Sequence, residues 1–243
     1  MKRRAFLLAA LAFATSCSAF KNPPGRPSQD SLVVPPSEIM DFDLLYGKNC
    51  AGCHGQDGRG GAAIGLGGPL YLAIADNATM SRVTADGVPE TAMPAFAQSS
   101  GGMLTSAQID AIVHGMRARW GKPTNLRALN PPPYRAQTHG DPKRGAMAYA
   151  VFCSSCHGSE GRGGTASSIV DSSYLSLVSD QGLRTIVIVG RPELGAPDWR
   201  GNVPNHPMSP EDVSDVVAWL ADQRPQFPGE PYASAQRTPG ELQ

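Results

Sequence analysis

The sequence has no excess of charge of either sign. Its 243 residues include 21 Lys and Arg and 21 Asp and Glu, so the formal net charge at pH 7 is +0. Domains that bind nucleic acid usually carry a basic surplus that neutralises phosphates. The charge balance therefore argues against a nucleic-acid binder, and it leaves the choice of partner to local patches that composition does not describe.

A hydrophobic run long enough to cross a membrane is also missing at the N-terminus. The run "AFLLAALAFA" is ten residues long, whereas a spanning helix needs about 20. It follows Lys2, Arg3 and Arg4 and precedes small residues, which is the order found in secretory signal peptides. We therefore expect residues 1–16 to be a signal peptide that exports the protein.

Cysteine is scarce, with five residues, and the first of them stands directly after the expected signal peptide. The stretch "ATSC" ending at Cys17 resembles a bacterial lipoprotein box, in which the cysteine is lipidated and begins the mature chain. The alternative is an ordinary small residue beside a cleavage site such as "AFA". The proline-rich stretch that follows suits a spacer. We predict a lipid anchor at Cys17 and a tether over residues 17–36, which place the protein on the periplasmic side of a bacterial membrane.

The other four cysteines form two Cys-x-x-Cys-His motifs. Their residues are Cys50, Cys53, His54, Cys153, Cys156 and His157. This spacing is typical of c-type haem attachment, because two thiols add to the two vinyl groups and the adjacent imidazole then lies beneath the iron. We therefore predict two covalently bound haem c groups as cofactors, with His54 and His157 as iron ligands.

The surroundings of the motifs are repeated as well. "YGKNCAGCHGQDGRGG" and "YAVFCSSCHGSEGRGG" align without a gap, 103 residues apart. The same offset relates Tyr71 to Tyr174 and Pro94 to Pro197. Self-similarity over such a length indicates duplication of a whole structural unit.

Helical signals frame each copy. Helices are predicted near residues 39–46 and 141–150, ahead of the motifs, and closing helices begin after Thr105 and Ser209, where N-cap residues precede apolar residues at helical spacing. We predict domains at residues 37–121 and 141–225, a linker at 122–140, and a C-terminal tail at 226–243.

Each half resembles a class I cytochrome c domain, and the pair resembles the diheme cytochromes c of bacterial respiratory chains. The resemblance implies an all-α fold of two tandem domains in which the first and last helices cross closely, usually with a glycine on one helix and an aromatic residue on the other. It predicts contacts between Phe42 and Gly115 and between Gly145 and Trp219.

The resemblance also places an axial methionine, commonly followed by proline, in the loop before the last helix. Met93 and Pro94 match this pattern, so Met93 is the predicted sixth ligand of haem 1. The aligned residue of the second copy is Ala196, which cannot coordinate iron. Three alternatives stay open for haem 2: ligation by Met208, ligation by His206, or a five-coordinate iron.

These observations favour an exported diheme cytochrome c that carries electrons to or from a membrane respiratory or photosynthetic complex, either as a free carrier or as a subunit. Its expected partners are a redox protein or such a complex, with no nucleic acid and no small-molecule substrate. It would not itself be an enzyme. Two alternatives remain: a diheme peroxidase-like enzyme that uses haem 2 as an open site, and the electron-transfer subunit of a periplasmic dehydrogenase.

Overall fold

The structure is a computed structural model that describes residues 33–121 and 126–225. The predicted signal peptide, Cys17, most of the tether, the start of the linker and the C-terminal tail lie outside these residues. Internal contacts separate residues 1–38 from residues 39–243, and the second unit contains both motifs. In the described part of the chain, every regular element is a helix, which confirms the all-α prediction.

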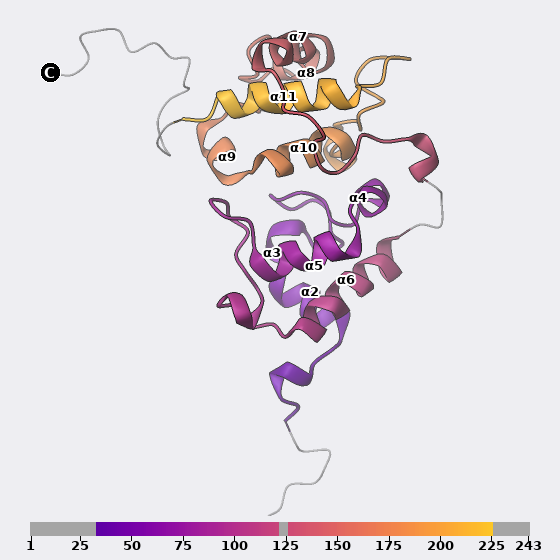
Figure 1. Ribbon diagram of the computed structural model, residues 1–243, viewed down its shortest axis with the longest axis vertical. Coiled ribbons are helices and arrows are strands. Elements are labelled where there is room, and N and C mark those ends of the chain that lie inside the picture. Colours follow the sequence, from indigo (N-terminus) through magenta and orange to yellow (C-terminus); the bar gives the residue numbers. More distant parts are fainter. Residues whose placement is uncertain (1–32, 122–125, 226–243) are drawn as a thin grey trace, which may run out of the picture. The chain divides into compact units, whose positions relative to one another are not determined.

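The helices of the first copy surround the first motif (Figure 1). In chain order they are α2 (Phe42–Asn49), α3 (Ala51–His54), α4 (Pro69–Ile74), α5 (Asn77–Asp86), η4 (Gln98–Ser100) and α6 (Ser106–Trp120). The short helix η3 (Pro36–Glu38) belongs to the unit that ends at Glu38. The short helix η5 (Leu126–Leu129) lies in the predicted linker.

The second copy repeats this order around its own motif. Its helices are α7 (Pro142–Phe152), α8 (Ser154–His157), α9 (Ser172–Leu177), α10 (Asp180–Val189), η6 (Pro192–Leu194) and α11 (Pro210–Asp222). The same succession of a long helix, a single helical turn, two middle helices and a long closing helix therefore occurs twice.

Side-chain caps determine where the long helices begin. Thr105 and Gln108 form the predicted capping box, and Ser209 forms a second one with Asp212 at the other predicted helix start. The first helix starts at Phe42, three residues later than predicted, because the Asp41 carboxylate accepts the Leu44 backbone N–H and so caps the N-terminus of the helix. Ile39, the first residue of the predicted range, lies outside the helix.

The first and last helices of each copy cross at a glycine, as predicted. A Cβ atom on Gly115 of α6 would lie 2.2 Å from Cδ2 of Phe42. A Cβ atom on Gly145 of α7 would lie 2.0 Å from the Asp215 carbonyl oxygen and 2.7 Å from Cβ of Trp219 in α11. Both expected pairs are in contact, so the small and large residues have exchanged helices between the copies while the close approach is kept.

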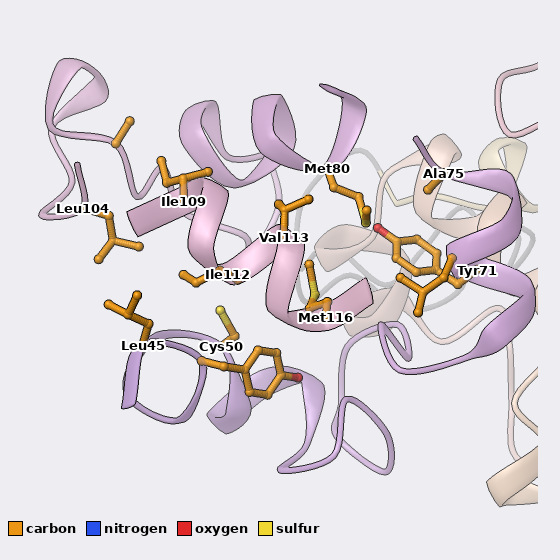
Figure 2. Packing of buried hydrophobic residues seen from close by; sticks show 13 residues of the cluster. Leu45, Cys50, Tyr71, Ala75, Met80, Leu104, Ile109, Ile112, Val113 and Met116 are labelled. Atoms are coloured by element: carbon orange, nitrogen blue, oxygen red, sulfur yellow. The ribbon is translucent and has the colours of Figure 1, made fainter. Parts of the chain in front are cut away.

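Each copy contains its own hydrophobic cluster. The cluster of the first copy takes buried residues from α2, α4, α5 and α6, and it includes Cys50. In Figure 2 the Cys50 sulfur points toward α6, which contributes Ile112 and Val113. The cluster of the second copy centres on α7, α10 and α11 and includes Trp199 and Met208. The motif cysteines therefore stand at the edge of a packed core.

We predict that Gly145→Ala lowers the free energy of unfolding by about 1–3 kcal/mol, because the added methyl group overlaps the backbone of α11. Gly47→Ala on α2 is the matched control, since nothing lies within 4 Å of the new Cβ atom. It should leave stability unchanged or raise it by about 0.5–1 kcal/mol. Urea unfolding of both variants measures the difference, and equal effects would contradict the crossing described here.

Candidate haem sites

Both motifs lie where a long helix gives way to a single helical turn. Cys50 follows the last residue of α2 and is also the N-cap of α3, which ends at His54. Cys153 plays the same two parts between α7 and α8. The first cysteine of each motif is tucked toward the core, whereas Cys53 and Cys156 are exposed. Each motif thus presents one inner and one outer thiol on the same turn.

Each motif histidine is oriented by a backbone carbonyl ten residues further along the chain. The ring Nδ1 of His54 lies 2.8 Å from the Ile64 oxygen, and Nδ1 of His157 lies 2.7 Å from the Ser167 oxygen. A carbonyl oxygen can only accept a hydrogen bond, so Nδ1 carries the proton. Nε2 of both rings is then left with the lone pair that a metal ligand needs.

Burial shifts the pKa of one motif histidine and of the first cysteine in each motif. It lowers the pKa of His54 below the usual value, although the hydrogen bond to Ile64 opposes this, so the ring stays neutral. Burial also raises the pKa of the Cys50 and Cys153 thiols to about 11. Both inner cysteines are therefore protonated thiols near neutral pH.

Glycine is required directly after each motif. Gly55 has φ +83°, and a Cβ atom there would lie 1.7 Å from the Arg59 carbonyl oxygen. Gly158 has φ +78°, and its Cβ atom would lie 2.4 Å from the Gly163 oxygen. The carbonyls of both glycines accept hydrogen bonds from tyrosine hydroxyls, Tyr46 for the first and Tyr149 for the second. The chain thus turns back sharply and brings the carbonyl acceptor to the histidine.

The Met93 loop is held against the end of α5. The Met93 carbonyl accepts the Val88 N–H at 3.0 Å, and the Met93 N–H donates to the Thr91 hydroxyl at 3.2 Å. A Cβ atom on Gly87 would lie 2.6 Å from Pro94 C and 2.8 Å from the Met93 oxygen. This close approach fixes the backbone of the predicted ligand, whose side chain is half-buried.

The corresponding loop of the second copy keeps the same backbone contact. A Cβ atom on Gly190 would lie 2.3 Å from the Pro197 oxygen and 2.8 Å from the Ala196 oxygen. The residue that replaces Met93 therefore occupies the equivalent place beside the equivalent glycine. The second copy has lost the thioether without losing the loop.

The two predicted substitutes for that thioether differ in exposure. Met208 is buried, with 2% of its surface accessible, and its N–H donates to the Trp199 carbonyl at 2.9 Å. His206 is exposed, and its ring centre lies 5.5 Å from that of Phe152, the residue before Cys153. The structure therefore brings both side chains to the core of the second copy, Met208 inside it and His206 at its edge.

One polar contact in this region was not foreseen from the sequence. The side-chain amide of Asn202 donates to the Met208 sulfur at 3.8 Å and to the Asp198 carbonyl at 3.4 Å. The only sequence signal here is that the stretch from Trp199 to Met208 is one residue longer than that from Phe96 to Leu104. An insertion of one residue does not reveal which side chain reaches the sulfur.

The residues present fit covalently bound haem c. Each motif offers two cysteine side chains without a disulfide and a histidine whose Nδ1 is already bonded, and these are the groups that thioether formation and iron ligation require.

The comparison with known families agrees with this donor set. The model of the family "Cytochrome C oxidase, cbb3-type, subunit III" matches residues 38–114 and 140–220, which together exceed half of the chain. The chain belongs to this family. Its cofactor is covalently bound haem c, and the two matched segments, one around each motif, account for two haem groups and two domains.

Relatives with similar sequences are cytochrome c subunits of cytochrome bc1 complexes. The chain is 27% identical over 177 residues to the cytochrome bc1 complex cytochrome c subunit of Mycobacterium bovis, covering 72% of this chain and 60% of the relative. The corresponding subunit of Corynebacterium diphtheriae is 24% identical over 195 residues, covering 75% and 65%. The chain thus spans less than two thirds of either relative.

Solved structures match more weakly. A chain of a reducing HAO-like protein complex from Kuenenia stuttgartiensis is 16% identical with a TM-score of 0.42, covering 78% of this chain and 99% of that chain.

Among the described residues, no helix is both long and apolar enough to cross a membrane.

We predict that the inner thiols react with iodoacetamide more slowly than the outer ones in protein made without haem. Cys50 and Cys153 combine burial with a raised pKa, and only the thiolate reacts. Their alkylation rate should rise about tenfold per pH unit between pH 8 and 10, below that pKa. Peptide mass spectrometry measures each site, after circular dichroism has verified the helical content. Equal labelling of all four cysteines at pH 8 would contradict the site.

Proposed function

We propose that this protein is an exported electron carrier with two haem c groups, serving a membrane respiratory complex of the cytochrome bc1 type. The observation that carries the proposal is a pair of matching contacts, in two halves that match one cytochrome family. In each contact, called a histidine clamp below, Nδ1 of His54 or His157 is bonded to a backbone carbonyl ten residues further on. Bound haem c supplies one-electron oxidation and reduction at iron.

In the first domain, we propose that Cys50 and Cys53 would attach the haem through thioether bonds and that His54 and Met93 would ligate its iron. The support for Met93 is its place in a loop anchored on Gly87. Histidine and thioether together favour reduced iron and a high potential, which suits a carrier. The half-buried Met93 side chain would also keep water and small ligands away from the iron.

In the second domain, Cys153, Cys156 and His157 take the corresponding roles, and Met208 is our choice for the sixth ligand. Its thioether is soft, buried and part of the domain core, whereas the alternative, His206, is exposed. A methionine at a different position of this loop would give haem 2 a different ligand environment from haem 1, so the two redox potentials should differ. Similar midpoint potentials would count against this assignment.

Membrane attachment and partnership are proposed from two separate arguments. The relatives are named as subunits of the bc1 complex, and this chain carries a lipoprotein-like "ATSC" sequence ahead of a proline-rich tether. Lipidation at Cys17 would hold the haem domains on the periplasmic side and raise their effective concentration near a membrane complex.

A second candidate function rests on Ala196. If no side chain replaces the lost thioether, haem 2 would bind small molecules, and a peroxidase-like activity would follow. The full-length holoprotein purified with its membrane partners discriminates between the two functions. We expect quinol to reduce both haems in a manner sensitive to inhibitors of the quinol site, without turnover of hydrogen peroxide. Peroxide turnover without reduction by quinol would overturn the carrier.

We predict that Met93→Ala opens haem 1 to carbon monoxide and lowers its midpoint potential, because the sixth ligand is lost. Met103→Ala is the control, since that methionine precedes the same closing helix but is 81% exposed. Magnetic circular dichroism and redox titration of the holoproteins measure both effects. An unchanged haem 1 in Met93→Ala would refute this ligand assignment.

A further inference from the structure

We propose that Asn202 is a positioning residue for the haem 2 ligand, holding the Met208 thioether through a hydrogen bond to sulfur. This inference rests on the proposed function, in which Met208 ligates the second iron. Asn202 itself would not touch the iron. It would set the orientation and the electron-donating strength of the sulfur atom that does.

The contact that carries the proposal joins two positions of one loop. The Asn202 amide nitrogen lies 3.8 Å from the Met208 sulfur, and this sulfur belongs to a side chain that is 2% exposed. A thioether is a weak acceptor, and it makes such a bond only where a donor is held close to it. The loop therefore presents a donor to the one sulfur atom that we assign to the iron of the second domain.

The amide is held in place by the turn that precedes it. The Asp198 carbonyl accepts both the Gly201 N–H, at 2.9 Å, and the Asn202 side-chain amide, at 3.4 Å. The Asp198 carboxylate in turn accepts the Arg200 backbone N–H at 3.0 Å and its guanidinium group at 2.7 Å. The same Nδ2 group of Asn202 thus donates both to the carbonyl of this turn and to the Met208 sulfur.

The backbone of Met208 is tied to the same turn. Its N–H donates to the Trp199 carbonyl at 2.9 Å, and the Arg200 guanidinium lies 4.9 Å from the centre of the Trp199 ring. The loop from Asp198 to Met208 is therefore closed twice, once through backbone and once through the amide and sulfur.

The first domain has the backbone closure but not the amide. Leu104, the counterpart of Met208, donates its N–H to the Phe96 carbonyl at 2.8 Å, yet its side chain has no acceptor. Ser99 occupies the position that aligns with Asn202, and it is exposed. The donor and the sulfur thus occur together in the domain that has Ala196 in place of a loop methionine.

A hydrogen bond to sulfur would have two measurable consequences. It withdraws electron density from the thioether, which makes the sulfur a poorer donor to ferric iron and favours the reduced state. It also restricts the Met208 side chain, which slows displacement of the sulfur by an external ligand. Removal of the donor should therefore lower the potential of haem 2 and accelerate its reaction with carbon monoxide.

The experiment uses the full-length holoprotein with both haems, comparing Asn202→Leu, Asn202→Asp and Asn202→Gln with Met208→Ala and the control Ser99→Ala. Leu and Asp are close to Asn in size but lack the amide donor, and Gln retains it. We measure the midpoint potential of each haem, the rate of carbon monoxide binding, and the long-wavelength absorption band of iron–thioether coordination.

The proposal expects Leu and Asp to lower the haem 2 potential and speed carbon monoxide binding while the thioether band persists. Gln should restore part of both values, and Ser99→Ala should change neither haem. If the thioether band persists but both values stay at those of the parent protein, Asn202 has no positioning role although Met208 remains the ligand. If Met208→Ala leaves the haem 2 spectrum unchanged, the ligand assignment and with it the role of Asn202 are wrong. Absence of reduction by quinol in the parent protein purified with its membrane partners would instead refute the electron-carrier function.

Discussion

The hydrogen bond between each motif histidine and a carbonyl ten residues further on is the interaction on which both sites depend. It fixes the proton on Nδ1 and leaves Nε2 for the metal. It exists because the chain turns back at Gly55 and Gly158, where a side chain would collide with backbone. The glycine turn after each motif therefore brings that carbonyl and that ring together.

The duplication lets one copy serve as the reference for the other. A Cβ atom on either Gly87 or Gly190 would overlap the backbone of its loop, so the exchange of Met93 for Ala196 removes a side chain and leaves the loop in place. Met208 in turn stands where the first copy has Leu104. On our account, a methionine has been lost at one position and gained at another, and the two haems share an attachment chemistry but differ in their sixth ligand.

Much of this architecture was predictable from local rules. Thr105 and Ser209 predicted the starts of the closing helices, because a cap acts within one helical turn. The resemblance to class I cytochromes c implied the two helix crossings, which the contacts at Gly115 and Gly145 confirm. The start of α2 was misplaced by three residues, because the cap at Asp41 was not recognised in the sequence. The contact between Asn202 and Met208 was out of reach, since it depends on the path of a loop lengthened by one residue.

The most direct test of the account is the intact mass of the denatured full-length holoprotein, which reports only covalently attached haem. We expect the mass of the chain to increase by two haem groups, and by one group in the double variant Cys153→Ser with Cys156→Ser. A single haem on the parent protein, or none, would contradict the claim that both histidine clamps belong to haem c sites.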